Sequence, residues 1–362
     1  MFSPADQQHM SEALRLAEKG LFTATPNPRV GCLIVRDGQA VGAGWHEKTG
    51  GPHAEALALQ AAGERARGAT AYISLEPCCH HGRTPPCVDA LIEAGITRVV
   101  AAMQDPNPRV AGSGFSRLRA AGIQVESGLM QGEARALNIG FVSRMSRGRP
   151  WVRMKIAASL DGRTALANGK SQWITGPEAR RDGHAWRARA CAVLTGIGTV
   201  RDDDPQLDVR EVETTRQPLK VVVDSRLQLP LSAKLLASGK VVVAAAVDDK
   251  AGIAALQDKG AEVVLLPNAR GKVELTQLMR ELARRELNEV QVEAGFKLNG
   301  SLLGEGLVDE LLVYLAPSIL GDSANGMFSL PELADLAQKR LVQFTDVQNI
   351  GGDLRILARV AN

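Results

Sequence analysis

The sequence predicts an α/β protein built from two domains. Short apolar segments typical of buried strands alternate with segments of helical periodicity along the whole chain. The length of 362 residues fits two domains of roughly 150 to 200 residues each. A polar, flexible stretch at 142–150 separates them, so we expect the domains at 1–147 and 148–362.

The first domain is expected to be a three-layer α/β/α sandwich. Ser3 before Pro4 is a plausible cap for the opening helix, and Gly20 ends it. A turn at 37–38 joins the first two strands as a hairpin. Proline near the start or glycine at the end marks further helices. Helices are expected at 4–19, 54–62, 88–94, 112–121 and 131–145, and strands at 30–35, 40–45, 69–75, 97–103 and 123–126.

The second domain is expected to continue as a parallel sheet, because helices separate its short apolar strands. The segment 195–200 has part of a dinucleotide-binding fingerprint, but Arg201 stands where the third glycine belongs, so we reject that motif. Glu293-Ala294-Gly295 closes a strand and opens a helix. Such a turn can hold a phosphate on free backbone N–H groups, or be only a tight turn. Strands are expected at 219–224, 240–245, 261–265 and 289–293, and helices at 177–189, 250–258, 273–286 and 296–304.

A histidine, several thiols and one isolated carboxylate lie close together in the first domain. His53, Cys78 and Cys87 offer one nitrogen and two sulfur ligands, which leaves a fourth tetrahedral position for water, as in catalytic zinc sites. Glu55 is the expected general acid and base. The spacing resembles the zinc deaminase signature H-x-E followed by P-C-x-x-C, although the second cysteine here comes nine residues after the first.

Two other interpretations of this cluster stay open. A structural zinc site would take its fourth ligand from the protein, and Cys79, His80 and His81 are near enough in the sequence. That interpretation gives Glu55 no task. A disulfide is disfavoured, because five cysteines is an odd number and we identify no secretory signal.

The overall charge argues against nucleic acid as the main partner. The 43 Lys and Arg residues are nearly balanced by 40 Asp and Glu, and the net charge of +3 is evenly spread, so no basic face is predicted. No apolar run approaches the roughly 20 residues that span a bilayer. We therefore expect a soluble cytoplasmic protein without a membrane partner, whose thiols stay reduced.

Five motifs of the first domain carry a family resemblance. They are Pro26-Asn27-Pro28, Gly51-Pro52-His53-Ala54-Glu55, Leu75-Glu76-Pro77-Cys78, the segment 80–87 and Asp105-Pro106-Asn107-Pro108. Together they resemble the deaminase domain of the bifunctional riboflavin biosynthesis enzymes, which has a cytidine-deaminase-like fold and binds one zinc ion per chain. The family spaces its second cysteine as this chain does. The resemblance implies substrate-binding side chains at Asn27, His46, His80, Arg83, Asp105 and Asn107, although Asn27 alone could equally be a turn residue.

The remainder of the chain, residues 151–362, resembles the reductase half of the same enzymes, a domain similar to dihydrofolate reductase. The matching segments are 155–162, 202–210 and 308–321. The resemblance implies NADPH contacts at Ala157, Trp173, Thr199, Asp203, Ser225, Gly295, Phe296, Lys297, Leu298, Asn299, Gly300 and Ser301. It implies contacts to the ribose phosphate substrate at Lys155, Ser171, Arg187, Leu207, Arg210 and Glu293. Each of these, taken singly, could be a plain surface or packing residue.

The resemblance implies two consecutive reactions. The first is the zinc-dependent hydrolytic deamination of 2,5-diamino-6-ribosylamino-4(3H)-pyrimidinone 5′-phosphate. The second is the NADPH-dependent reduction of its ribosyl side chain, which gives 5-amino-6-ribitylamino-uracil 5′-phosphate. A homodimer or higher homo-oligomer is expected. The alternatives are an RNA or nucleoside deaminase with an accessory domain, a zinc-stabilised scaffold without activity, and a chain in which one half is inactive.

Overall fold

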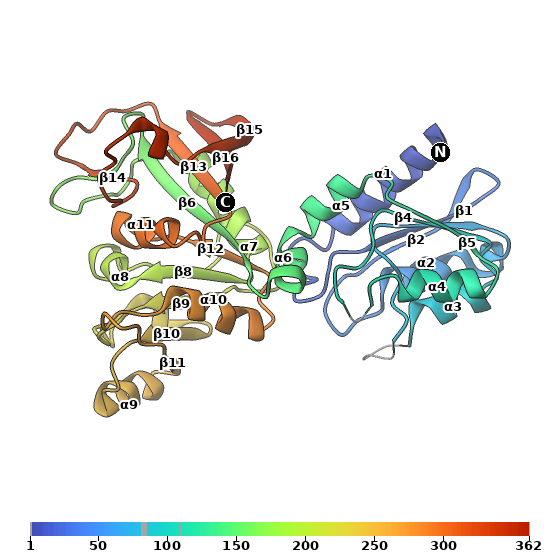
Figure 1. Ribbon diagram of the computed structural model, residues 1–362, viewed down its shortest axis with the longest axis horizontal. Coiled ribbons are helices and arrows are strands. Elements are labelled where there is room, and N and C mark those ends of the chain that lie inside the picture. The colour runs from blue at the N-terminus through green and yellow to red at the C-terminus, as the bar shows by residue number, and fades with distance from the viewer. Residues whose placement is uncertain (1, 81–84, 109, 362) are drawn as a thin grey trace. The chain divides into compact units, whose positions relative to one another are not determined.

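The computed structural model describes residues 2–80, 85–108 and 110–361. The chain divides into two compact units, Met1–Gly148 and Arg149–Asn362, each with its own main sheet (Figure 1). Each unit also has its own hydrophobic cores. Among the described residues, no helix has both the length and the apolar character of a membrane span.

The first unit confirms the predicted α/β/α sandwich. Its five strands lie in the order β2-β1-β3-β4-β5, with β1 antiparallel to both neighbours and β3, β4 and β5 parallel. Helices α2, α3 and α4 pack on one face of the sheet, and α1, α5 and α6 pack on the other (Figure 1). The strands are β1 (Gly31–Arg36), β2 (Gln39–Trp45), β3 (Thr70–Ile73), β4 (Arg98–Ala101) and β5 (Gln124–Ser127). The helices are α1 (Pro4–Glu18), α2 (Ala54–Ala62), the 3-10 turn η1 (Gly63–Ala66), α3 (Cys87–Glu93), α4 (Ser113–Ala120), α5 (Gln131–Leu137) and α6 (Ile139–Arg147).

The helix expected at 131–145 is in fact two helices. The two helices separate at Asn138. The side chain of this residue pairs with the backbone of Arg29. Its Oδ1 accepts the Arg29 N–H at 2.7 Å, and its Nδ2 donates to the Arg29 carbonyl at 2.9 Å. Because a buried backbone group needs a hydrogen-bond partner, this amide ties the end of the unit to the segment before β1.

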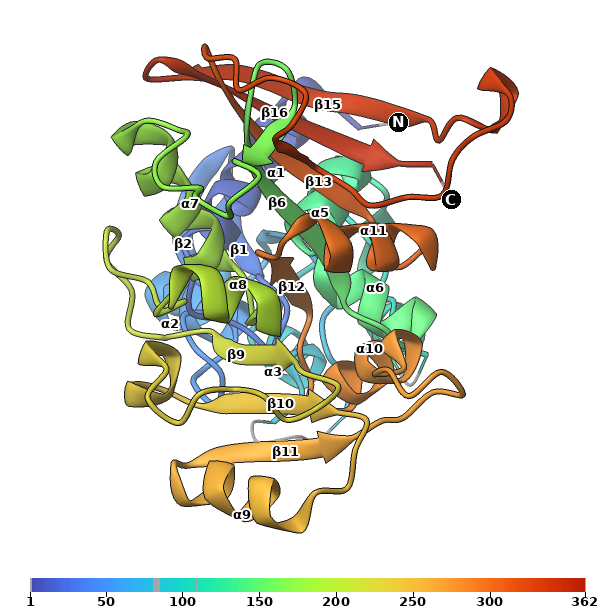
Figure 2. The same cartoon turned by 90° about the vertical axis from the view of Figure 1, so that its left-hand side faces the viewer.

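The second unit contains a nine-stranded sheet in the order β11-β10-β9-β8-β12-β6-β13-β16-β15, which Figure 2 shows stacked from β11 to β15. A separate two-stranded sheet joins β7 and β14. The strands are β6 (Trp151–Ser159), β7 (Arg163–Ala165), β8 (Ala192–Gly196), β9 (Leu219–Val223), β10 (Val241–Ala245), β11 (Ala261–Leu265), β12 (Glu289–Val292), β13 (Glu310–Ala316), β14 (Asn325–Gly326), β15 (Val342–Ile350) and β16 (Asp353–Val360). The helices are α7 (Pro177–Arg189), α8 (Ile197–Asp203), η2 (Lys234–Ala237), α9 (Lys250–Asp258), α10 (Leu275–Arg284), α11 (Phe296–Gly304) and η3 (Leu336–Gln338).

The prediction of a parallel sheet holds for only part of this unit. Strands β11 to β13 are parallel, but β16 and β15 close the sheet as antiparallel strands. A tight turn at 351–352 joins these two strands, and a turn that short produces an antiparallel pair.

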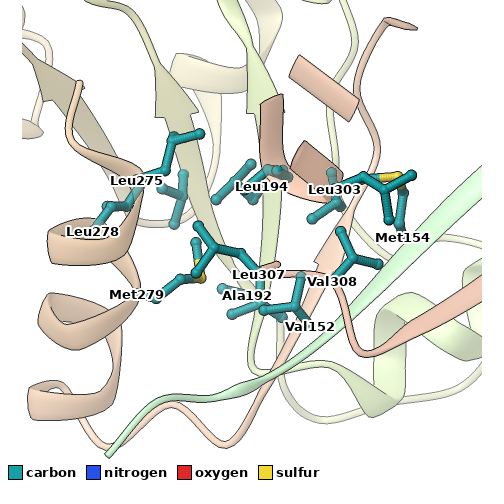
Figure 3. Close-up of a cluster of buried hydrophobic side chains, with 14 of the residues drawn as sticks. Val152, Met154, Ala192, Leu194, Leu275, Leu278, Met279, Leu303, Leu307 and Val308 are labelled. Atoms are coloured by element: carbon teal, nitrogen blue, oxygen red, sulfur yellow. The ribbon is translucent and has the colours of Figure 1, made fainter. Parts of the chain in front are cut away.

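Buried aliphatic side chains hold α10 and α11 to one face of the large sheet. Figure 3 shows this core, in which Leu278 and Met279 of α10 and Leu303 of α11 meet Val152 and Leu194 of the central strands. Helices α8 and α9 pack on the opposite face through Val200 and Leu256. The consequence for function is that the carboxyl ends of β6, β12, β8 and β9 all open on one edge, where parallel sheets bind ligands.

Candidate active sites

Three side chains of the first unit converge into a cluster that can hold a metal ion. The ligand atoms of His53, Cys78 and Cys87 all lie within 4.8 Å of one another. His53 Nδ1 is 3.2 Å from Cys87 Sγ and 3.5 Å from Cys78 Sγ. One imidazole nitrogen and two sulfurs are a donor set that suits zinc, so the residues fit the ion that the sequence predicts.

Local structure explains why these residues meet. His53 is the N-cap of α2 in an extended conformation, which turns its side chain toward the helix start. Cys87 is the first residue of α3 after Pro86, and its N–H donates to Cys78 Sγ at 3.3 Å. Cys78 follows β3 at the carboxyl end of the parallel strands. The two helix starts and the strand end therefore deliver one ligand each.

The two thiols share a proton unevenly. The hydrogen bond from Cys87 lowers the pKa of the Cys78 thiol to about 4, and the same hydrogen bond raises the pKa of Cys87 far above its usual range. A sulfur that is a thiolate in neutral solution is ready to bind a cation. Cys79 and His80 are outside the three-residue cluster in the part of the chain that the structure describes. His81 is outside the described residues.

Glu55 lies on the first turn of α2 beside the cluster. Its side chain is buried, at 3% exposed, and burial together with the charge of Cys78 raises its pKa. A carboxyl group whose pKa moves toward neutrality can both accept and return a proton, which is what a general acid and base requires.

Asn27 and His46 are joined to each other beside the cluster. His46 Nδ1 is 3.0 Å from the Pro52 carbonyl, which can only accept, so this nitrogen carries the proton. His46 Nε2 then accepts from Asn27 Nδ2 at 3.0 Å. Burial lowers the pKa of His46, so the ring is a neutral imidazole. Its centroid is 5.4 Å from that of His53.

The predicted residues after β4 lie at the same end of the sheet. Asp105 Oδ1 accepts the Asn107 N–H at 2.8 Å, which folds the segment into a tight turn. Burial raises the pKa of Asp105 to about 6, and the hydrogen bond from the Asn107 N–H opposes that rise. Arg83, also predicted to bind substrate, is outside the described residues.

The second unit has a cavity of about 1370 Å³ along the carboxyl edge of its parallel strands. Every predicted contact of this unit except Gly300 lines it. Gly300 packs on the opposite side of α11, where a Cβ would meet the Ser329 carbonyl at 2.0 Å, so glycine is required there by packing. The rejected fingerprint at 195–200 forms the junction of β8 and α8, and its Thr199 lines the cavity.

A buried ion pair forms the floor of this cavity. The Nε and Nη2 of Arg187 donate to the two carboxylate oxygens of Glu293 at 2.6 and 2.9 Å, and its Nη1 donates to the Asp208 carbonyl at 3.0 Å. The guanidinium expected to bind phosphate is therefore already engaged within the chain. Burial alone would raise the pKa of Glu293, but the charges of Arg187 and Lys155 lower it to about 2. Burial also lowers the pKa of Lys155 itself.

This ion pair predicts an acid-sensitive second unit. A carboxyl whose folded pKa is depressed contributes stability above its unfolded pKa and loses that contribution as the pH falls through the folded value. For Glu293 the loss should occur between about pH 4.3, the usual glutamate pKa, and about pH 2. Denaturant unfolding of the native chain across this interval should show the decline, and Glu293→Gln should have a flatter dependence. Equal slopes in the two proteins would contradict the prediction.

Several orphaned polar groups in the cavity suit a large polar cofactor. Asp224 Oδ2 and Asn299 Oδ1 are buried without a hydrogen-bond partner among the described atoms, and both residues line the cavity. Gly295 is the N-cap of α11 and has no side chain that could cap the helix, so no such cap pairs the first N–H groups of α11, which lie along the cavity. Trp173 stands 70% exposed at the mouth with Arg180 stacked on its ring at 4.7 Å. These features fit a dinucleotide with its phosphates at the helix start.

Sequence reasoning missed the residues at the far end of the cavity. Asp224, Arg226, Arg270 and Lys272 line it after β9 and β11, and the three cations are exposed. Within the described parts of the chain, Arg226, Arg270 and Lys272 form no salt bridge. Their charged groups are therefore available to a ligand. The signal that could have identified them is their position in the segments that follow strands of the same parallel sheet.

Comparisons with known proteins agree with both sites. Residues 3–103 match the model of the cytidine and deoxycytidylate deaminase zinc-binding region, and residues 150–356 match the RibD C-terminal domain. The chain is 48% identical to the riboflavin biosynthesis protein RibD of Escherichia coli, with 96% of this chain and 98% of that protein aligned. A solved structure of Acinetobacter baumannii RibD is 44% identical to this chain in sequence and has a TM-score of 0.91. The match covers 99% of each chain. A solved Thermotoga maritima protein, titled as a diaminohydroxyphosphoribosylaminopyrimidine deaminase and 5-amino-6-(5-phosphoribosylamino)uracil reductase, is 32% identical with a TM-score of 0.88 and 99% coverage of both chains.

A zinc-dependent deaminase joined to a reductase is the class of protein that the two units define. The alignment with RibD of Escherichia coli covers 96% of the chain at 48% identity, which identifies the family within this class. The chain belongs to the RibD family of riboflavin biosynthesis proteins. It is accordingly a bifunctional enzyme, a hydrolase and an oxidoreductase, with zinc and NADPH as its cofactors.

Proposed function

We propose that residues 1–147 deaminate 2,5-diamino-6-ribosylamino-4(3H)-pyrimidinone 5′-phosphate and that residues 148–362 reduce the product to 5-amino-6-ribitylamino-uracil 5′-phosphate. The observation that carries the first reaction is the buried carboxyl of Glu55 beside a three-ligand metal cluster. The similar Thermotoga maritima protein, whose title names both activities, supports the substrates.

In the proposed deamination, His53, Cys78 and Cys87 hold the zinc ion. Zinc in such a site acts as a Lewis acid that makes water a nucleophile near neutral pH. Glu55 takes a proton from the attacking water at its carboxylate oxygen and returns a proton to the departing amino nitrogen, which leaves as ammonia. The residues that bind the base and the ribose phosphate are Asn27, His46, His80, Arg83, Asp105 and Asn107.

In the proposed reduction, bound NADPH would supply the hydride that reduces C1′ of the ribosylamino group. The bond from C1′ to the ring oxygen breaks, and that oxygen takes up a proton to become a hydroxyl. Lys155 and Glu293 orient the sugar, and Arg187 fixes Glu293. Arg210, whose side chain is 48% exposed, reaches the phosphate. Ser171 donates to Asp203 at 2.9 Å and so joins the substrate side of the cavity to the cofactor side. The remaining contacts are Leu207 to the substrate and Ala157, Trp173, Thr199, Asp203, Ser225, the segment 295–299, Gly300 and Ser301 to the cofactor.

The cations at the far end of the cavity should select NADPH over NADH. The two cofactors differ by one phosphate on the adenosine ribose, and exposed Arg and Lys side chains attract it. Arg226→Ala combined with Lys272→Ala should weaken NADPH binding about tenfold or more and leave NADH binding unchanged. Fluorescence titration of the reduced nicotinamide measures both constants. Lys250→Ala, which removes an exposed lysine outside the cavity, is the control, and an equal loss for both cofactors would argue against selection.

A coupled assay tests the function as a whole. Without NADPH, the pyrimidine phosphate should release ammonia and the deaminated ribosylamino compound should accumulate. Addition of NADPH should consume that compound. Release of ammonia from RNA or cytidine alone would favour the alternative of an RNA or nucleoside deaminase with an accessory domain, and failure of one step only would identify an inactive half.

We further propose a cytoplasmic homodimer or higher homo-oligomer that binds no nucleic acid. In this proposal Cys78 and Cys87 are metal ligands, and metal-binding thiols fit a reducing compartment. The edge strand β15 supports self-association, because Val342, Phe344 and Val347 on it are 43, 66 and 51% exposed. Light scattering that gives the mass of one chain at micromolar concentration would overturn the oligomer.

A further inference from the structure

One buried carboxylate collects four backbone hydrogen bonds beside the metal cluster. Glu76, which is 3% exposed, accepts the N–H groups of Asp105 at 3.1 Å and Gly112 at 2.9 Å on Oε2. Its Oε1 accepts those of Gly114 at 2.9 Å and Phe115 at 3.3 Å. An ionised carboxylate has about four acceptor positions, so this group is fully used.

Glu76 supplies a helix cap that the local sequence lacks. Helix α4 begins after Gly112, which has no side chain to accept the first N–H groups. The Glu76 carboxylate, which comes from the segment after β3, takes that place and also complements the positive end of the helix dipole. Gly114 permits the approach, because a Cβ there would meet the Pro77 carbonyl at 2.2 Å. The start of α4 is thus locked against the segment 76–78.

This network connects two parts of the deaminase site. On one side, Glu76 is separated from the ligand Cys78 only by Pro77, whose ring restricts the backbone. On the other side it holds the N–H of Asp105, whose own carboxylate fixes Asn107. Glu76 is neither one of the three metal ligands nor the proposed general base, so an effect on the reaction has to pass through the backbone it holds.

We infer that Glu76 is a positioning residue for the deamination, which fixes the turn of Asp105 and Asn107 at a set distance from the metal ligands. The inference rests on the proposed function, in which these two residues bind the pyrimidine substrate. Glu76 then governs substrate binding more than the chemical step, because it holds the turn of Asp105 and Asn107 and is itself neither the general base nor a metal ligand.

The variant Glu76→Gln tests this in the full-length zinc enzyme. An amide directs its NH₂ group at two of the four N–H donors, so half of the network is lost. The KM for the pyrimidine substrate should rise about ten- to a hundredfold, the range for lost hydrogen bonds to a charged group. Zinc content and NADPH-dependent reduction should remain those of the native chain, and kcat should change far less than KM. Amide hydrogen exchange should accelerate in the segment 105–115.

Asp6 offers a matched control at the opposite end of the parallel strands. It is also buried, at 5% exposed, and accepts four hydrogen bonds, two from Ser3 and one each from Tyr72 and Arg98. Asp6→Asn should lower the stability of the same unit without a change in KM. Equal KM values for Glu76→Gln and the native enzyme, or the same KM rise in both variants, would overturn the inference.

Glu76→Asp covers the case in which the glutamine variant does not fold. The shorter acid keeps its charge and reaches only part of the network, so it should give an intermediate KM and intermediate exchange. Loss of zinc and folding in both variants would assign Glu76 a purely structural role. If the native enzyme does not act on the pyrimidine, the proposed function fails, whereas unchanged exchange at 105–115 in Glu76→Gln rejects the positioning role independently.

Discussion

Glu55→Gln should reduce deamination by about 10²- to 10⁴-fold, the contribution of a positioned general acid and base. Glutamine has nearly the same shape but cannot accept the proton of the attacking water. Because Glu55 is not among the three ligand side chains, the variant should keep its zinc and its fold. Ammonia release measures the reaction, and atomic emission measures the metal.

The matched control for this variant is Glu64→Gln, which changes an exposed glutamate of the same unit, just after α2. It should leave deamination at the native rate. Reduction in the second unit should continue in both variants. A parallel loss of metal, fold and deamination in Glu55→Gln would favour the zinc-stabilised scaffold over the enzyme.

Glu293→Gln should lower the free energy of unfolding of the second unit by about 3–5 kcal/mol, the usual effect of removing one partner from a buried ion pair. Arg187 and Glu293 are only 16 and 11% exposed, so water replaces the lost partner poorly. Reduction should be lost as well, since the variant leaves the guanidinium unpaired at the floor of the cavity. Denaturant unfolding followed by tryptophan fluorescence reports mainly on this unit, which contains Trp151, Trp173 and Trp186, whereas the first unit contains only Trp45.

The double variant Arg187→Met with Glu293→Gln separates stability from activity. It removes both charges, so no unpaired charge of the pair stays buried, and much of the lost stability should return. Reduction should not return, because the carboxylate that orients the sugar is absent. Recovery of both properties would mean that the pair serves folding alone.

Most of the fold could be predicted because its signals are local. The capped helix at the N-terminus and the alternation of apolar strands with helices correctly gave the α/β/α sandwich of the first unit. Two features depend on contacts distant in the sequence and were missed. Asn138 interrupts a helix only because its amide finds Arg29, 109 residues away, and the pairing of β16 with β13 joins strands separated by a long loop.

The metal cluster could be predicted because its residue types and spacing state the chemistry directly. His53, Cys78 and Cys87 lie together in the structure as that chemistry requires. The role of Arg187 could not be predicted, since nothing in a sequence shows that its donors are used by Glu293 and Asp208. The same holds for Glu76, whose importance lies in the four N–H groups that the fold brings to it.

The amide of Asn138 also determines how this enzyme can be divided. The matched deaminase region ends at residue 103, which suggests that a short fragment could work alone. Cleavage anywhere before residue 138 would strip the N–H and carbonyl of Arg29 of their partners and loosen the stretch that carries Asn27 into the site. A free-standing deaminase half must therefore retain Asn138, and truncations before it should yield a weakened catalyst even with every zinc ligand present.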